Sequence, residues 1–189
     1  MKTKLMNQLQ SLLDLVPALI QKCESRESGF VKSVKQWFTD AENLLAASHK
    51  PRLVALTQLQ ANIVAAQQGV FEPSFALDAA MPKRKAMSAI AVFSLERARE
   101  ILHILLQSLI KNIEESRTLI RQALLLAHQK GIISKHCKLD DSLDNPTMAL
   151  WNKLAATQDI RTRLNQVLTL VSYAEALNLM AVVLEELPA

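Results

Sequence analysis

Arg121 and His128 are the two side chains whose types and spacing point most directly to catalysis. They lie seven residues apart in a segment with helical periodicity. Seven residues make nearly two full turns of an α-helix, so the two side chains come within about 20° of each other on one face. The pair is therefore a candidate catalytic site on a single helix.

The segment from Arg121 to His128, RQALLLAH, resembles the Arg-x4–6-His motif of the HEPN family of helical-bundle ribonucleases and toxins. The resemblance implies that the pair acts on RNA at a dimer interface, with the histidine in acid–base chemistry and the arginine beside the phosphate. It covers eight residues of 189, and the polar residue that often follows the arginine in the family is Gln122 here. It therefore predicts a HEPN-like ribonuclease or toxin as one possible function.

A solvated stripe on the helix is the simpler interpretation of the same residues. Charged and titratable side chains recur at spacings of three and four along this segment, and Arg121 and His128 continue that series. Intrahelical ion pairs such as Glu114 with Arg117 would stabilise such a face without any catalytic role. The members of the series are Glu96, Arg99, His103, Glu114, Arg117 and Arg121.

Lys83, Arg84 and Lys85 form the only run of three cationic residues, and they stand at the start of the longest predicted helix. The helix macrodipole favours anions at that end, so each cation costs a few tenths of a kcal/mol there. The run is therefore a candidate anion-binding site, and it allows weak nucleic-acid binding as a further function. A plain solvated helix start is the alternative, because the net charge is only +4 and aromatic residues are too few for base stacking.

His128, His136 and Cys137 could in principle bind Zn²⁺, because imidazole and thiolate are its preferred ligands. The spacing is irregular, however, and Lys135 and Lys138 would repel a cation, so we expect an ordinary loop and no metal or cofactor. The sequence also lacks a glycine-rich phosphate loop, a Cys-x-x-Cys pair and a His-Glu-x-x-His motif. These absences favour a protein that is not an enzyme.

The composition predicts helices. Hydrophobic residues make up 50% of the chain but aromatic residues only 4%, and 3 glycines are too few for the many turns of a β fold. Two distant cysteines and the absence of a signal peptide indicate a cytoplasmic protein. The most lipophilic window, 164–184, contains Asn165 and Glu175, so it predicts a buried helix and not a transmembrane segment.

Apolar residues recurring every three or four positions mark the expected helices. The first is expected to kink near Val16 because Pro17 interrupts its hydrogen bonding, and Asn145 is expected to cap the last. An apolar loop at 70–81 is expected to pack over an open end of the core. The expected helices are 3–23, a second after the turn at 24–29, a third from Pro51 to Gly69, a fourth from Pro82 to Lys130, and a last from Pro146 to Leu187 with an interruption near Gln158.

We therefore predict an all-α fold: one domain, 1–189, forming an elongated antiparallel bundle of five to seven helices around a long central helix. That helix would span about 72 Å unless it breaks near Asn112 to Ser116. Two segments, Ala86–Leu95 and Leu177–Leu187, are apolar nearly all round, as only a central or an interface helix would be. The favoured function is thus protein–protein association in a regulatory or adaptor role, with self-association as a homodimer.

Overall fold

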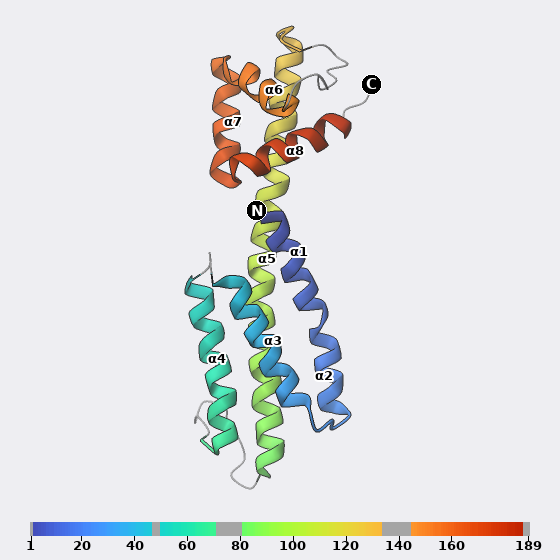
Figure 1. Ribbon diagram of the computed structural model, residues 1–189, viewed down its shortest axis with the longest axis vertical. Helices are drawn as coiled ribbons and strands as arrows, with labels where there is room; N and C mark the ends of the chain where they lie inside the picture. The colour runs from blue at the N-terminus through green and yellow to red at the C-terminus, as the bar shows by residue number, and fades with distance from the viewer. Residues whose placement is uncertain (1, 47–49, 71–80, 134–144, 187–189) are drawn as a thin grey trace. The chain divides into compact units, whose positions relative to one another are not determined.

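The computed structural model describes residues 2–46, 50–70, 81–133 and 145–186, and every regular element in these ranges is an α-helix (Figure 1). Because α1 and α2 are separated by Leu15 alone, they count as one kinked helix, which makes seven helices within the described ranges. The predicted all-α bundle is confirmed. The bounds are α1 (Lys2–Asp14), α2 (Val16–Glu24), α3 (Phe30–Leu45), α4 (Lys50–Gln68), α5 (Lys83–Gln129), α6 (Pro146–Ala155), α7 (Gln158–Leu170) and α8 (Tyr173–Glu186).

The expected kink lies between α1 and α2. Pro17 occupies the first turn of α2, where its missing N–H leaves no helical hydrogen bond unmade. Leu13 and Val16 are both buried, so the two helices keep one apolar face across the break.

Residue contacts divide the chain into two compact units. The first unit is Leu5–Gln107, and the second unit combines Met1–Lys4 with Ser108–Ala189. The prediction that 1–189 acts as a single domain stays a prediction.

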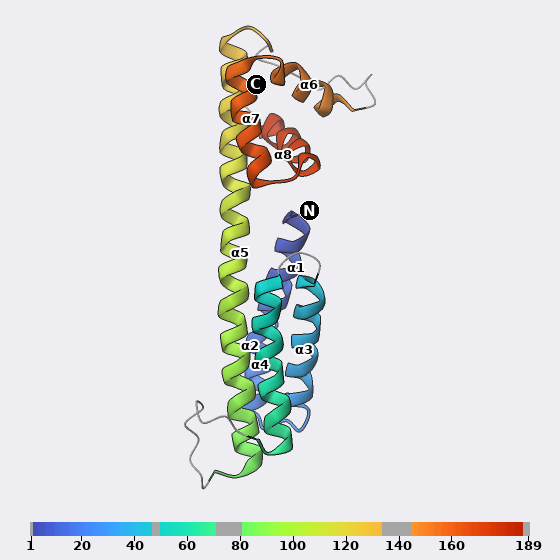
Figure 2. The ribbon, with the colours of Figure 1, turned by 90° about the vertical axis from the view of Figure 1, so that its left-hand side faces the viewer.

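The first unit contains α2, α3, α4, most of α1 and the beginning of α5. Helix α3 packs against both α2 and α4, and α5 lies beside them in both views (Figures 1 and 2). The buried face of α5 carries small residues here, Ala86, Ala91 and Ala98, which let neighbouring helices approach closely. Trp37 is buried, and its indole N–H donates a hydrogen bond of 2.8 Å to the carbonyl of Leu12.

The second unit is built on the later part of α5, against which α6, α7 and α8 pack around one hydrophobic core. The chain bends by 117° between α7 and α8. The sequence predicted a single helix here with one interruption near Gln158; that prediction was wrong, because there is a second break at Val171. The backbone of Val171 is extended, with φ −136° and ψ 163°. The hydroxyl of Ser172 then accepts a long hydrogen bond, 3.4 Å, from the N–H of Glu175 and so caps the start of α8.

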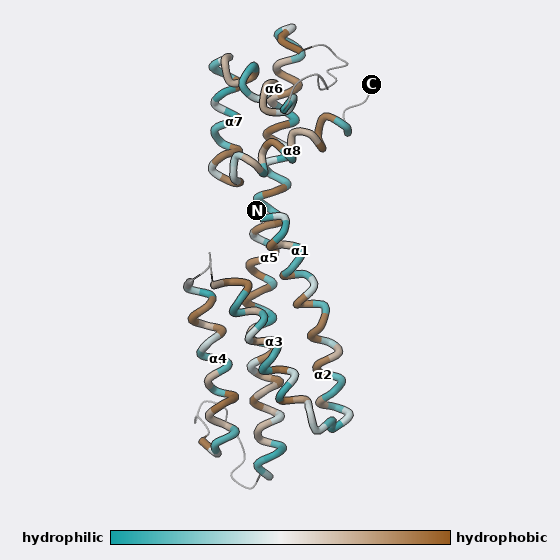
Figure 3. Tube along the Cα trace, in the orientation of Figure 1, coloured by the Kyte–Doolittle hydropathy of each residue, from teal (hydrophilic) through white to brown (hydrophobic). Residues whose placement is uncertain are grey.

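Helix α5 is continuous from Lys83 to Gln129, so the alternative of a break near Asn112 to Ser116 does not occur. Ser116 is buried, but its hydroxyl donates to the carbonyl of Asn112 at 2.7 Å, so it needs no partner outside the helix. Apolar and polar residues alternate in bands along the whole helix (Figure 3). The expected loop at 70–81 lies largely outside the described residues.

Within the described part of the chain, no single helix is long and apolar enough to cross a membrane. Helices α7 and α8 reach that length and apolar content only when taken together, and the chain bends sharply between them.

Candidate functional site

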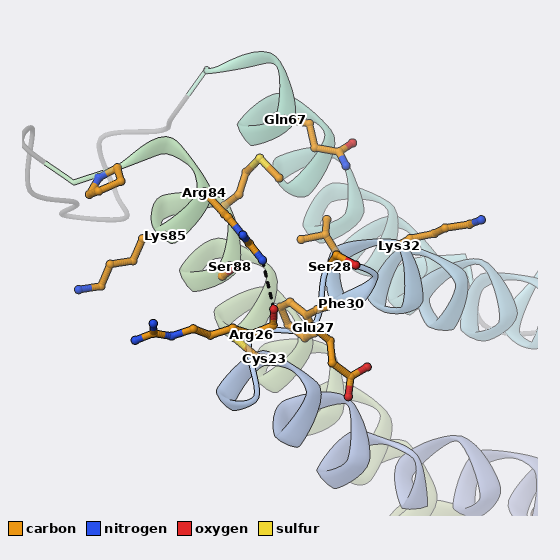
Figure 4. A pocket seen from close by; sticks show the side chains of 13 residues that line it. Cys23, Arg26, Glu27, Ser28, Phe30, Lys32, Gln67, Arg84, Lys85 and Ser88 are labelled. Atoms are coloured by element: carbon orange, nitrogen blue, oxygen red, sulfur yellow. Dashed lines mark hydrogen bonds between the residues drawn. The ribbon is translucent and has the colours of Figure 1, made fainter.

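The first unit contains a cavity of about 650 Å³ where α2 ends, α3 begins and α5 begins (Figure 4). We call it the cationic pocket, because four of its lining residues are cationic and only one is acidic. The half-buried and buried side chains of Cys23, Phe30, Val31 and Met87 give it a partly apolar wall. The charged residues that line it are Arg26, Glu27, Lys32, Arg84 and Lys85.

The turn between α2 and α3 forms one side of the pocket. Arg26 has a φ of 56°, in the left-handed region that glycine normally occupies. Its N–H donates to the carbonyl of Cys23, and the N–H of Glu27 donates to the carbonyl of Lys22, each at 3.0 Å. These two hydrogen bonds define a Schellman motif with Arg26 at the C′ position, and they satisfy carbonyls at the end of α2.

The first turn of α5 forms the other side. The guanidinium of Arg84 donates a hydrogen bond of 3.1 Å to the backbone carbonyl of Arg26, which ties the start of α5 to the α2–α3 turn (Figure 4). Gln67, near the end of α4, completes the lining, and its side-chain oxygen accepts a hydrogen bond from the ammonium of Lys35. Residues from four helices thus converge on this pocket.

The four cations that line the pocket outnumber its one described carboxylate, Glu27. Arg26, Arg84 and Lys85 form no ion pair among those residues, whereas Arg97, for example, pairs with Glu100. The side chains of Arg26 and Lys85 extend to the same side of the view in Figure 4, while those of Lys32 and Glu27 extend elsewhere. Arg26, Arg84 and Lys85 therefore form a positive edge suited to an anion.

Covalent chemistry has little support in this pocket. Burial, and secondarily the nearby carboxylate of Glu24, raise the pKa of the Cys23 thiol. The thiol therefore stays protonated at neutral pH and is a weak nucleophile. The described residues that line the pocket include no histidine.

A smaller groove of about 410 Å³ lies between α2 and α3 and shares Lys32 with the cationic pocket. Leu15, which is 53% exposed, and Trp37 supply its apolar surface. Lys22 and Lys32 supply cations, and Asp40 is its one acidic residue.

The predicted catalytic pair lies on the solvent-exposed surface of α5 in the second unit. Arg121 is held by Glu186 of α8, with 3.0 Å between guanidinium nitrogen and carboxylate oxygen, and Arg117 pairs with the same carboxylate. The side chain of His128 is exposed at the last turn of the helix, and the described pockets do not include it. The ion pair between Arg117 and Glu114, expected for a solvated stripe, is also present. The catalytic role stays a prediction.

The three residues of the predicted anion-binding run do not all lie at one site. Arg84 and Lys85 line the cationic pocket, but Lys83 does not: its ammonium lies beside Gly69, 3.6 Å from where a Cβ would stand. Sequence reasoning missed Arg26 and Lys32. No local pattern could have found Arg26, because its contact with Arg84 joins residues 58 apart in the chain.

Two other sequence predictions concern metal binding and apolar faces. Among the residues described, no three His, Cys, Asp or Glu side chains gather as metal ligands, and His136 and Cys137 lie outside those residues. The two strongly apolar segments are used mainly inside their own units. Of the residues in 86–95, only Ala89 and Phe93 are classed as exposed, and on the far end of α8 the exposed apolar residue is Val182.

The chain matches no protein-family model, no curated protein and no solved structure.

Proposed function

We propose that this chain is a non-enzymatic binding protein that recognises an acidic segment of a partner protein at the cationic pocket. The observation that carries the proposal is the positive edge formed by Arg26, Arg84 and Lys85 beside a partly apolar wall. A protein–protein role is also the function that the sequence favours.

The size and lining of the pocket support a peptide segment as the occupant. A volume of about 650 Å³ lies in the range of sites that enclose a small ligand or a few side chains. Cations beside apolar surface suit a segment that combines carboxylates with an apolar or aromatic residue. Nucleic acid fits less well, because three clustered cations neutralise few phosphates and the one aromatic lining residue, Phe30, is buried.

Fluorescence anisotropy with labelled six-residue peptides tests the proposal. We expect Glu-Glu-Leu-Phe-Glu-Glu to bind, with an affinity that falls as salt rises, and Gln-Gln-Leu-Phe-Gln-Gln to bind at least about fivefold more weakly. A labelled hexauridylate RNA, which also has six units, provides the comparison with nucleic acid. Equal binding of the two peptides, or tighter binding of the RNA, would contradict the proposal.

Matched variants on the same helix locate the binding site. The double variant R84Q/K85Q removes two charges from the pocket, whereas R99Q/K111Q removes two exposed charges of α5 outside it. We expect the first to weaken binding of the acidic peptide about fivefold or more and the second to leave it unchanged. If both pairs weaken binding alike, the interaction is non-specific and the cationic pocket is not the site.

A further inference from the structure

The same helix-ending turn occurs three times in the described part of the chain. At the ends of α2, α4 and α5, a left-handed residue donates to the carbonyl three positions before it, and the next residue donates to the carbonyl five before it. The left-handed residues are Arg26, Gly69 and Gly131, with φ values of 56°, 86° and 68°. Two of the three turns use glycine, and the turn at the cationic pocket uses arginine.

Arginine is the less stable choice for this backbone conformation. Glycine enters the left-handed region without steric cost, whereas a Cβ there crowds the backbone. The guanidinium of Arg26 makes no hydrogen bond or ion pair with any described residue, so contacts of the side chain do not offset the cost. The one interaction at this position, from Arg84, is accepted by the backbone carbonyl, which a glycine would retain.

We propose that Arg26 is a ligand-binding residue of the cationic pocket and that its guanidinium binds a carboxylate of the occupant. The inference rests on the proposed function, and Arg26 lies outside the run of cations from Lys83 to Lys85 that the sequence predicted to bind an anion. A guanidinium presents two parallel N–H donors that match the two oxygens of a carboxylate. Arg26 and Lys85 line the same pocket and extend to the same side of the view in Figure 4, which suits them to one acidic segment.

Exchanging arginine and glycine between equivalent turns tests this role in the full-length chain. R26G removes the side chain and relieves the backbone, so we expect the melting temperature to rise by about 2–4 °C. The affinity for Glu-Glu-Leu-Phe-Glu-Glu is expected to fall about fivefold. R26K keeps the charge and the backbone strain but loses the two parallel N–H donors of the guanidinium. We therefore expect a wild-type melting temperature and an affinity for the acidic peptide between those of wild type and R26G.

G131R is the matched control, because it places an arginine in the equivalent turn at the end of α5. A Cβ at Gly131 meets no described atom within 4 Å, and the left-handed backbone, with a φ of 68°, opposes the change. We expect a melting temperature lower by about 2–4 °C and an unchanged affinity for the acidic peptide.

The outcomes separate this inference from the proposed function. If the wild-type chain does not bind the acidic peptide, the proposed function is wrong and this role of Arg26 is wrong with it. If R84Q/K85Q weakens binding but R26G does not, the pocket binds anions without Arg26 and only this inference is overturned. If R26G lowers the melting temperature, Arg26 has a structural role, which also overturns it.

Discussion

Glu175 offers the sharpest test of how the second unit is held together. The residue is 1% exposed, and its carboxylate accepts hydrogen bonds from the N–H and the hydroxyl of Thr3, both at 2.7 Å, and from the N–H of Lys2 at 3.1 Å. Lys2 and Thr3 are the first residues of α1, so the buried charge satisfies free N–H groups at the positive end of that helix. The change to test is E175Q, which keeps the shape but removes the charge.

The expected loss follows from these three hydrogen bonds. The amide of E175Q can still accept from Thr3 through its oxygen, but its NH₂ group then faces the N–H of Lys2. A charge-assisted hydrogen bond contributes about 1.5–3 kcal/mol net, and the losses are not additive, so we expect the free energy of unfolding to fall by about 2 kcal/mol. For a chain of this length that corresponds to a melting temperature lower by roughly 4–8 °C.

The pH dependence of this difference has a definite sign. Burial raises the pKa of Glu175, but the hydrogen bonds from Thr3 and Lys2 lower it, and the net pKa lies below the ordinary value. The stabilisation is therefore fully present above the unfolded-state pKa of about 4.3, and it is lost as the pH falls through the lowered folded-state pKa. Thermal melts of wild type and E175Q should differ by a constant amount from pH 6 to 8, with the gap closing under more acidic conditions.

E185Q is the matched control, because Glu185 is exposed on the same helix and makes no hydrogen bond within the described residues. We expect its stability to stay within about 0.5 kcal/mol of wild type. If E175Q and E185Q melt alike, or if the E175Q difference is unchanged below pH 4, the carboxylate does not hold the start of α1 and the reasoning is refuted.

Three further predictions concern other residues. Ser94 is fully buried and its hydroxyl has no hydrogen-bond partner among the described residues, so S94A should raise the free energy of unfolding by about 1 kcal/mol in denaturant titrations; a loss would show that the hydroxyl has a partner in solution. If the HEPN resemblance is meaningful, the purified chain should cleave RNA and the H128A variant should not; an intact substrate with wild type would exclude this role for Arg121 and His128. Light scattering after size-exclusion chromatography should give twice the mass of 21.1 kDa if the chain forms the homodimer that its sequence suggests, and a mass that stays at one chain at all concentrations would contradict it.

The helices were predictable because their bodies obey one rule. Apolar residues return every three or four positions, and glycine at 69 and 131 and asparagine at 145 provide the expected ends; the side chain of Asn145 accepts from the N–H of Met148 at 3.0 Å. The break at Val171 was not predictable from this rule, because apolar residues continue at helical spacing on both sides of it and neither glycine nor proline marks it. Only the Ser172-x-x-Glu175 sequence hinted at a new helix start there.

The candidate site was predictable only in part, for a related reason. Lys83, Arg84 and Lys85 are conspicuous as a run, yet consecutive helical residues point in different directions, so the run could not remain together on one surface. The turn at 24–29 contains Gly29, but Gly29 has a φ of −89° and the left-handed residue is Arg26. The left-handed residue of a short turn is the one whose N–H can reach a free carbonyl at the end of the preceding helix. Residue types alone do not determine its position.

Two of the long-range contacts of this chain lie at helix ends. A helix leaves N–H groups free at its start and carbonyls free at its end, and neither can be satisfied by the regular repeat that forms the helix. In the first unit a side chain at the start of α5, Arg84, donates to the carbonyl of Arg26 just beyond the end of α2; in the second, Glu175 of α8 accepts from Thr3 at the start of α1. Both contacts join residues far apart in sequence, so hydrophobic periodicity cannot reveal them. Substitutions at these ends should therefore change binding or stability more than substitutions of exposed residues in mid-helix, and the control R99Q/K111Q in the middle of α5 measures that contrast for binding.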